Sequence, residues 1–91
     1  MDIYTFIMEF RGGTYISQVK ENDVNTAMIL WSKSLQLTQV KFLGRKGILE
    51  LQDEIKSESP TRIRDVDNVW CFCLRIKSGL LMVNVIKTAK E

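Results

Sequence analysis

The chain has 91 residues, of which 45% are hydrophobic and 26% are charged, and its net charge at pH 7 is +2. This length predicts one domain over residues 1–91, and the composition excludes a disordered chain. The near-neutral charge gives no reason to expect a nucleic-acid or membrane partner, and no apolar run approaches the roughly 20 residues of a membrane-spanning helix.

The sequence contains no histidine and only two cysteines, Cys71 and Cys73. The absence of histidine excludes Ser-His-Asp and Cys-His catalysis and most zinc sites. On a strand the two thiols point to one face at a separation unsuited to a disulfide, and no secretion signal is recognisable. We therefore predict a cytoplasmic protein with reduced thiols that is not an enzyme and has no catalytic, cofactor-binding or metal-binding residues.

The first elements are two strands, Ile3 to Phe10 and Thr14 to Lys20, which are rich in β-branched and aromatic residues. Gly12-Gly13 suits a two-residue hairpin turn, which requires positive φ. With this turn, Phe10 lies opposite Tyr15. One face of the hairpin is then largely apolar and the other is mixed, as expected for a sheet with one solvated side.

Two helices are predicted next. From Asp23 to Ser34, apolar residues recur at helical spacing after a polar run that offers N-cap residues. From Lys46 to Lys56 we favour a second, shorter helix, because Leu, Glu, Gln and Lys dominate there; alternation of apolar and polar side chains also permits a strand. Pro60 disfavours helix at the residue before it. Thr61 to Asn68 is predicted to be a polar connection.

The most apolar stretch, Asn68 to Thr88, predicts two strands with a two-residue turn at Ser78-Gly79. In this register Ile76 lies opposite Leu81. A slip of one residue would exchange the two faces. The face predicted to enter the core carries Trp70, Phe72, Leu74, Ile76, Leu81, Val83 and Val85.

The element order is therefore β-β-α-α-β-β. The simplest packing is an α+β fold, in which two β-hairpins form one four-stranded antiparallel sheet and one or two helices pack on one face. The pattern leaves the strand order open.

The other face of the closing hairpin is unusually apolar. A contiguous exposed apolar patch marks a partner surface or a dimer interface. Ile7 and Ile16 of the first hairpin point the same way in this arrangement. We therefore predict a partner-binding face that consists of Val69, Cys71, Cys73, Met82 and Ile86.

Several other groups of residues favour ordinary structural roles. Two thiols supply only half of a tetrahedral zinc site. Asp65 and Asp67, with Glu58 upstream, fit a solvated loop better than a cation site. A small-molecule site would need a concave pocket with convergent polar groups. No small-molecule partner is predicted; the candidate residues for such a site would be Tyr4, Tyr15, Arg75, Asp65 and Asp67.

Basic residues could contact phosphates if the fold gathered them on one surface. Acidic residues interleave with them along the chain, which favours an ordinary solvated face. The basic residues concerned are Lys41, Arg45, Lys46, Arg62 and Arg64.

The segment from Phe10-Arg-Gly-Gly-Thr-Tyr through Gln18-Val19 to Ala27 and Trp31 resembles the hairpin-then-helix start of HicB-like antitoxin domains. The closing hairpin departs from that pattern. The resemblance implies a toxin-neutralising or immunity-type binder as an alternative function. The leading prediction is a small protein–protein interaction module or homodimer, and a weak nucleic-acid-binding domain is the other alternative.

Overall fold

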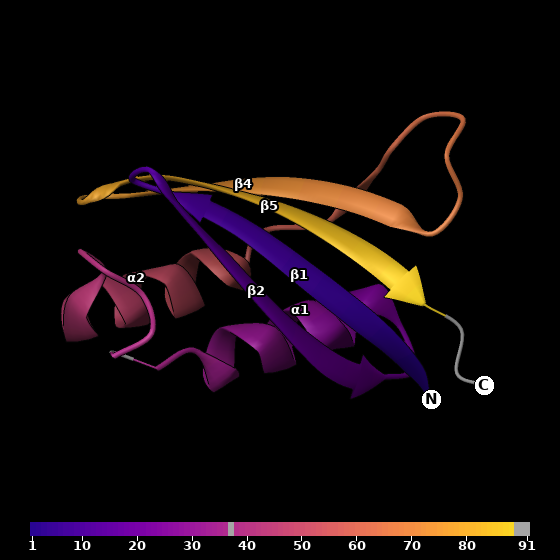
Figure 1. Ribbon diagram of the computed structural model, residues 1–91, viewed down its shortest axis with the longest axis horizontal. Helices are drawn as coiled ribbons and strands as arrows, with labels where there is room; N and C mark the ends of the chain where they lie inside the picture. Colours follow the sequence, from indigo (N-terminus) through magenta and orange to yellow (C-terminus); the bar gives the residue numbers. More distant parts are fainter. Residues whose placement is uncertain (37, 89–91) are drawn as a thin grey trace.

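The computed structural model describes residues 1–36 and 38–88. Within them the chain forms two helices and a five-stranded antiparallel sheet, and both helices lie on one side of the sheet (Figure 1). The predicted α+β fold and both predicted helices are therefore confirmed. The elements in chain order are β1 (Asp2–Phe10), β2 (Gly13–Glu21), α1 (Val24–Ser34), α2 (Gly44–Ile55), β3 (Thr61–Arg62), β4 (Val69–Ile76) and β5 (Gly79–Thr88).

The strand order in the sheet is β2-β1-β5-β4-β3. The last strand, β5, lies between β1 and β4, so it joins the two hairpins into one sheet (Figure 1). The predicted four-stranded sheet is wrong, because Thr61 and Arg62 form a fifth strand opposite Cys71 and Trp70. This polar pair has no strand pattern of its own. It pairs because β4 offers it a free edge.

The first hairpin turns one residue earlier than predicted. Arg11 and Gly12 form the turn, with φ of 47° and 83°, which is the geometry of a type I′ turn. Phe10 therefore pairs with Gly13, and the predicted pair of Phe10 with Tyr15 is wrong. Because the pairing shifts by two residues, the same side chains stay on each face. Gly13 lies outside the turn, and the Tyr15 side chain packs closely against it: a Cβ at position 13 would lie 2.6 Å from Tyr15 Oη.

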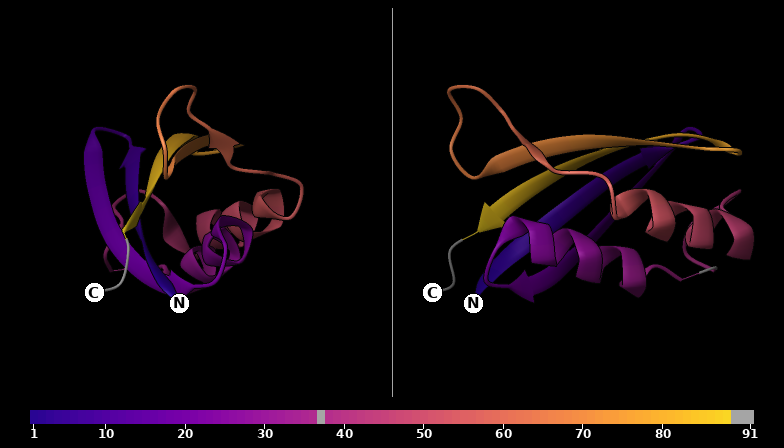
Figure 2. Two further views of the ribbon diagram at one scale, coloured as in Figure 1. Left: turned by 90° about the vertical axis from the view of Figure 1, so that its right-hand side faces the viewer. Right: turned by 180° about the vertical axis from the view of Figure 1, so that it is seen from behind.

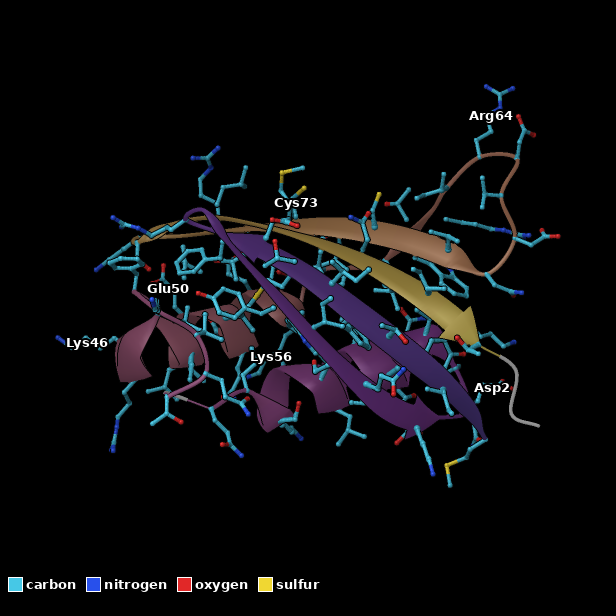
Figure 3. The ribbon with its side chains drawn as sticks, in the orientation of Figure 1. Asp2, Lys46, Glu50, Lys56, Arg64 and Cys73 are labelled. Carbon is cyan, nitrogen blue, oxygen red and sulfur yellow. The ribbon has the colours of Figure 1, made fainter. Side chains whose placement is uncertain are left out.

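The closing hairpin shows the same displacement. Lys77 and Ser78 form its turn, and Ile76 pairs with Gly79, so the predicted pair of Ile76 with Leu81 is wrong. The Lys77 backbone N–H donates to Glu50 Oε2 at 3.0 Å. Figure 3 shows Glu50 reaching from α2 towards the sheet. This turn is therefore tied to the helix layer, and the faces of the hairpin are again as predicted.

The hydrophobic core lies between the sheet and the helices (Figure 2). Trp31 of α1 stacks on Phe6, with ring centroids 5.1 Å apart, and meets Phe72 edge-on at 5.8 Å. These contacts connect α1 to both hairpins. The predicted core face of the closing hairpin is buried, except that Trp70 is only partly buried. Each fully buried Val, Leu, Ile, Phe or Met side chain contributes about 1.5–3 kcal/mol to the free energy of unfolding.

Helix α1 begins at Asp23, whose Oδ1 accepts a hydrogen bond from the Thr26 backbone N–H at 2.8 Å. This N-cap satisfies a donor that the helix itself leaves free. Gln52 Nε2 of α2 donates to the Ser32 carbonyl oxygen of α1 at 3.1 Å. The two helices are thus linked to each other as well as to the sheet. Neither helix is long and apolar enough to cross a membrane, as judged from the described residues.

Candidate functional site

The outer face of the sheet is the face that points away from both helices. Figures 1 and 2 show the helices on the opposite side, and Cys73 projects from the sheet away from them in Figure 3. No other helix or strand of the described chain covers this face. A sheet face left uncovered in this way is available to another molecule.

The five residues of the predicted partner-binding face lie together there, on β4 and β5. Cys73 lies opposite Met82, and Val69 lies opposite Ile86. Cys71 is between Val69 and Cys73 on the same face of β4, because alternate residues of a strand share a face. We call these five residues the outer patch.

The outer patch is accessible from solvent. Met82 is 51% exposed and Ile86 is 37% exposed. Cys73 is also exposed, whereas Val69 and Cys71 are half-buried. Both cysteines are free thiols. The patch is therefore an apolar surface and not part of the core beneath it.

A line of cross-strand neighbours extends the outer patch towards β2. Cys71 lies opposite Asn84, Asn84 lies opposite Ile7, and Ile7 lies opposite Ile16. Ile16 is 66% exposed. Uncharged side chains therefore run across the outer face from β4 to the far edge of the sheet.

Few charged side chains interrupt this face. Glu9 lies opposite Met82, and its Oε2 accepts a hydrogen bond from Thr14 Oγ1 at 2.9 Å. Arg75 and Lys20 lie towards the ends of their strands. Burying an uncharged surface avoids the cost of desolvating ions. The centre of the outer face is thus suited to contact with another apolar surface.

The structure does not gather the basic residues into one surface. Figure 3 shows Lys46 and Arg64 at opposite ends of the molecule. The guanidinium group of Arg62 is paired with Asp67 Oδ1 at 2.6 Å. Lys46 and Arg64 therefore do not belong to one shared basic surface.

The residues considered for a small-molecule site are also dispersed. Tyr4 and Tyr15 lie on the inner side of the sheet, and burial raises the pKa of the Tyr4 phenol. Arg75 lies on strand β4, with its side chain on the outer face, while Asp65 and Asp67 belong to the loop between β3 and β4. The described side chains also include no group of three histidine, cysteine or acidic residues that could hold a metal ion.

A groove between α1 and α2 was not predicted from the sequence. It has a volume of about 510 Å³, and its apolar lining includes Met28, Ile29, Leu49 and Ile55. Its shape depends on how the two helices pack, which no local pattern reports. The available signal was the position of Ile29 and Leu49, because both are apolar yet lie outside the buried stripe of their helix.

In comparisons with known proteins, no protein-family model, no curated protein and no solved structure matches this chain.

Proposed function

We propose that this protein is a non-enzymatic cytoplasmic interaction module that binds another protein through the outer patch. The observation that carries the proposal is the contiguity of five apolar or weakly polar side chains on an uncovered sheet face. Contiguous apolar surface of this kind marks interaction sites in soluble proteins. The cytoplasmic assignment rests on the two free thiols.

The shape of the surface favours a protein partner over a small molecule. Small-molecule sites are concave and enclose most of their ligand, whereas the outer patch is a row of side chains on a sheet. Removing apolar surface from water contributes about 25 cal/mol per Å². A protein surface can cover the pairs Cys73–Met82 and Val69–Ile86 at the same time.

The partner can be found by photocrosslinking in the cells that make the protein. A photoreactive amino acid replaces Met82, and a matched control replaces Leu49, an apolar residue of α2 that is 60% exposed. We expect one discrete crosslinked partner from position 82 and none from position 49. The same partner from both positions, or none from position 82, would contradict the proposal.

The purified partner then allows a quantitative test by calorimetry. We expect Met82→Lys to weaken binding at least tenfold, or about 1.4 kcal/mol, because it places a charge in the contact. Leu49→Lys should leave the affinity unchanged. Circular dichroism should show that both variants are folded. If the captured partner is a toxin, the toxin-neutralising alternative becomes the specific form of this function.

A further inference from the structure

We propose that two copies of this chain pair along the free edge of β2, antiparallel and with a two-fold axis at Ile16, so that one continuous sheet runs through both copies. This surface is distinct from the outer patch, and the inference does not rest on the proposed function. The two edges of the sheet differ in length. Strand β2 has 9 residues, whereas β3 at the opposite edge has 2.

The middle of β2 carries no protective residue of its own, and the segment before α2 lies beside it, where the Lys41 backbone N–H donates to Tyr15 Oη at 3.2 Å and Gln39 and Val40 line a cavity with Ile16. Natural proteins protect an edge strand with charges, proline, a bulge or a covering segment. Residues 14–19 contain no charged residue, proline or glycine. Strand β2 pairs with β1 without a bulge from Asp2 opposite Glu21 to Phe10 opposite Gly13. Among the described residues, no backbone hydrogen bond from outside the sheet reaches β2.

The backbone groups that point to the free edge follow from the hairpin geometry. In a two-residue turn the residues that flank it, Phe10 and Gly13, form a hydrogen-bonded pair. Backbone groups along a strand then alternate in direction. Those of Thr14, Ile16 and Gln18 therefore point away from β1 and are available to a second strand.

A strand that pairs with its own copy around a two-fold axis must meet it antiparallel. With the axis at Ile16, Ile16 lies opposite Ile16 of the second copy, and Thr14 lies opposite Gln18 of the second copy. Within each copy Ile16 already lies opposite Ile7. Four isoleucine side chains would therefore form one apolar row across the junction on the outer face.

This register also suits the remaining residues of the strand. On the inner side Tyr15 lies opposite the small Ser17 of the second copy. A shift of two residues would put Ile16 opposite Gln18 and Thr14 opposite Lys20. That register loses the contact between the isoleucines, so the axis at Ile16 is favoured.

A crosslinking experiment tests the register directly. In the Cys71→Ser, Cys73→Ser background, Ile16→Cys places two thiols on the axis, in a hydrogen-bonded pair. The Cα separation of such a pair, about 5.5 Å, lies within the range of disulfides. We expect oxidised glutathione to give a disulfide-linked dimer. Thr14→Cys in the same background is the control, because its copies lie about 13 Å apart and should not crosslink.

Sedimentation equilibrium of the full chain tests the interface itself. We expect the unmodified protein to be a dimer and Ile16→Lys to be a folded monomer. Position 16 is exposed in a single copy and accepts lysine there, whereas in the dimer two lysines would face each other at the axis. Met82→Lys should remain a dimer. A monomeric unmodified protein, or dissociation by Met82→Lys in place of Ile16→Lys, overturns the proposal. Equal crosslinking of Thr14→Cys and Ile16→Cys also overturns it.

The two proposals fail independently of each other. Loss of the dimer in Ile16→Lys leaves the outer patch intact, so partner binding at Met82 can still be measured in that variant. Conversely, failure to find a partner leaves the sedimentation result unchanged. If both proposals hold, the dimer presents two copies of the outer patch on one extended sheet.

Discussion

Arg11 and Ser78 join the tips of the two hairpins, since Arg11 Nη1 donates a hydrogen bond to the Ser78 carbonyl oxygen at 3.0 Å. The guanidinium carbon of Arg11 also lies 4.8 Å from the centroid of the Phe42 ring. One side chain therefore connects the first turn, the second turn and the segment before α2. The backbone of Arg11 has φ of 47°, a value that favours glycine.

Substitutions at Arg11 should separate its side-chain contacts from its backbone conformation. We expect Arg11→Ala to lower the free energy of unfolding by about 1 kcal/mol, because it removes an exposed hydrogen bond and a cation–π contact. Arg11→Gly loses the same contacts but relieves the positive φ, so its loss should be smaller. Urea unfolding measures both. A larger loss for the glycine variant would show that the backbone is not strained there.

Trp31 should be among the most sensitive positions in the chain. It is 1% exposed and contacts Phe6 and Phe72. We expect Trp31→Ala to lower the free energy of unfolding by about 3–5 kcal/mol, because it leaves a cavity between the helix and both hairpins. Trp31→Phe keeps an aromatic ring and should cost clearly less. Equal effects of the two variants in chemical denaturation would contradict this account of the core.

Adjacent residues of β5 should differ in how strongly their truncation destabilises the fold. Val83 is 1% exposed and Met82 is 51% exposed. We expect Val83→Ala to lower the free energy of unfolding by about 2–3 kcal/mol and Met82→Ala by less than about 1 kcal/mol. Thermal or urea unfolding checks this pair. A reversed order would mean that the inner and outer faces are exchanged.

Asp23 should make the stability depend on pH. The backbone N–H of Thr26 and its hydroxyl donate to the carboxylate and lower the pKa of Asp23 below its ordinary value of 3.8. A carboxylate whose pKa is lowered in the folded state stabilises the protein at pH values above its ordinary pKa. This contribution to the free energy of unfolding is lost as the pH falls through the folded-state pKa. Between about pH 5 and about pH 3, the unfolding midpoint should therefore fall more steeply for the unmodified protein than for Asp23→Asn.

Asp23→Asn is the matched control because asparagine also caps helices but does not titrate. Asp23→Ala should lower the unfolding midpoint at neutral pH as well. Identical pH dependence in the unmodified protein and Asp23→Asn would exclude a role for the Asp23 carboxylate.

The two thiols should differ in their rate of alkylation. Cys73 is exposed and Cys71 is half-buried. In the folded protein we expect Cys73, measured in Cys71→Ser, to react with iodoacetamide faster than Cys71, measured in Cys73→Ser. After unfolding in urea the rates should converge, because the difference comes from burial. Faster reaction of Cys71 in the folded protein would contradict the orientation of β4.

Local patterns were sufficient for the type of most elements and for the two faces of each hairpin. The helical spacing around Trp31 predicted α1, and the alternation from Trp70 to Ile76 predicted which side of β4 is buried. Both turns lie one residue earlier than predicted, but the predicted inner and outer faces are correct. A register shift of two residues keeps every side chain on the same face of its strand. For the same reason the residues of the outer patch could be named from sequence.

Only the tertiary structure decided how these elements meet. The pairing of β1 with β5, the fifth strand at Thr61 and Arg62, and the free edge of β2 all depend on contacts between distant residues. The residues within a short window of sequence do not determine those contacts. Gly13 is the clearest case. Its sequence context indicates a turn, but the packed ring of Tyr15 requires a glycine there, in the first position of a strand.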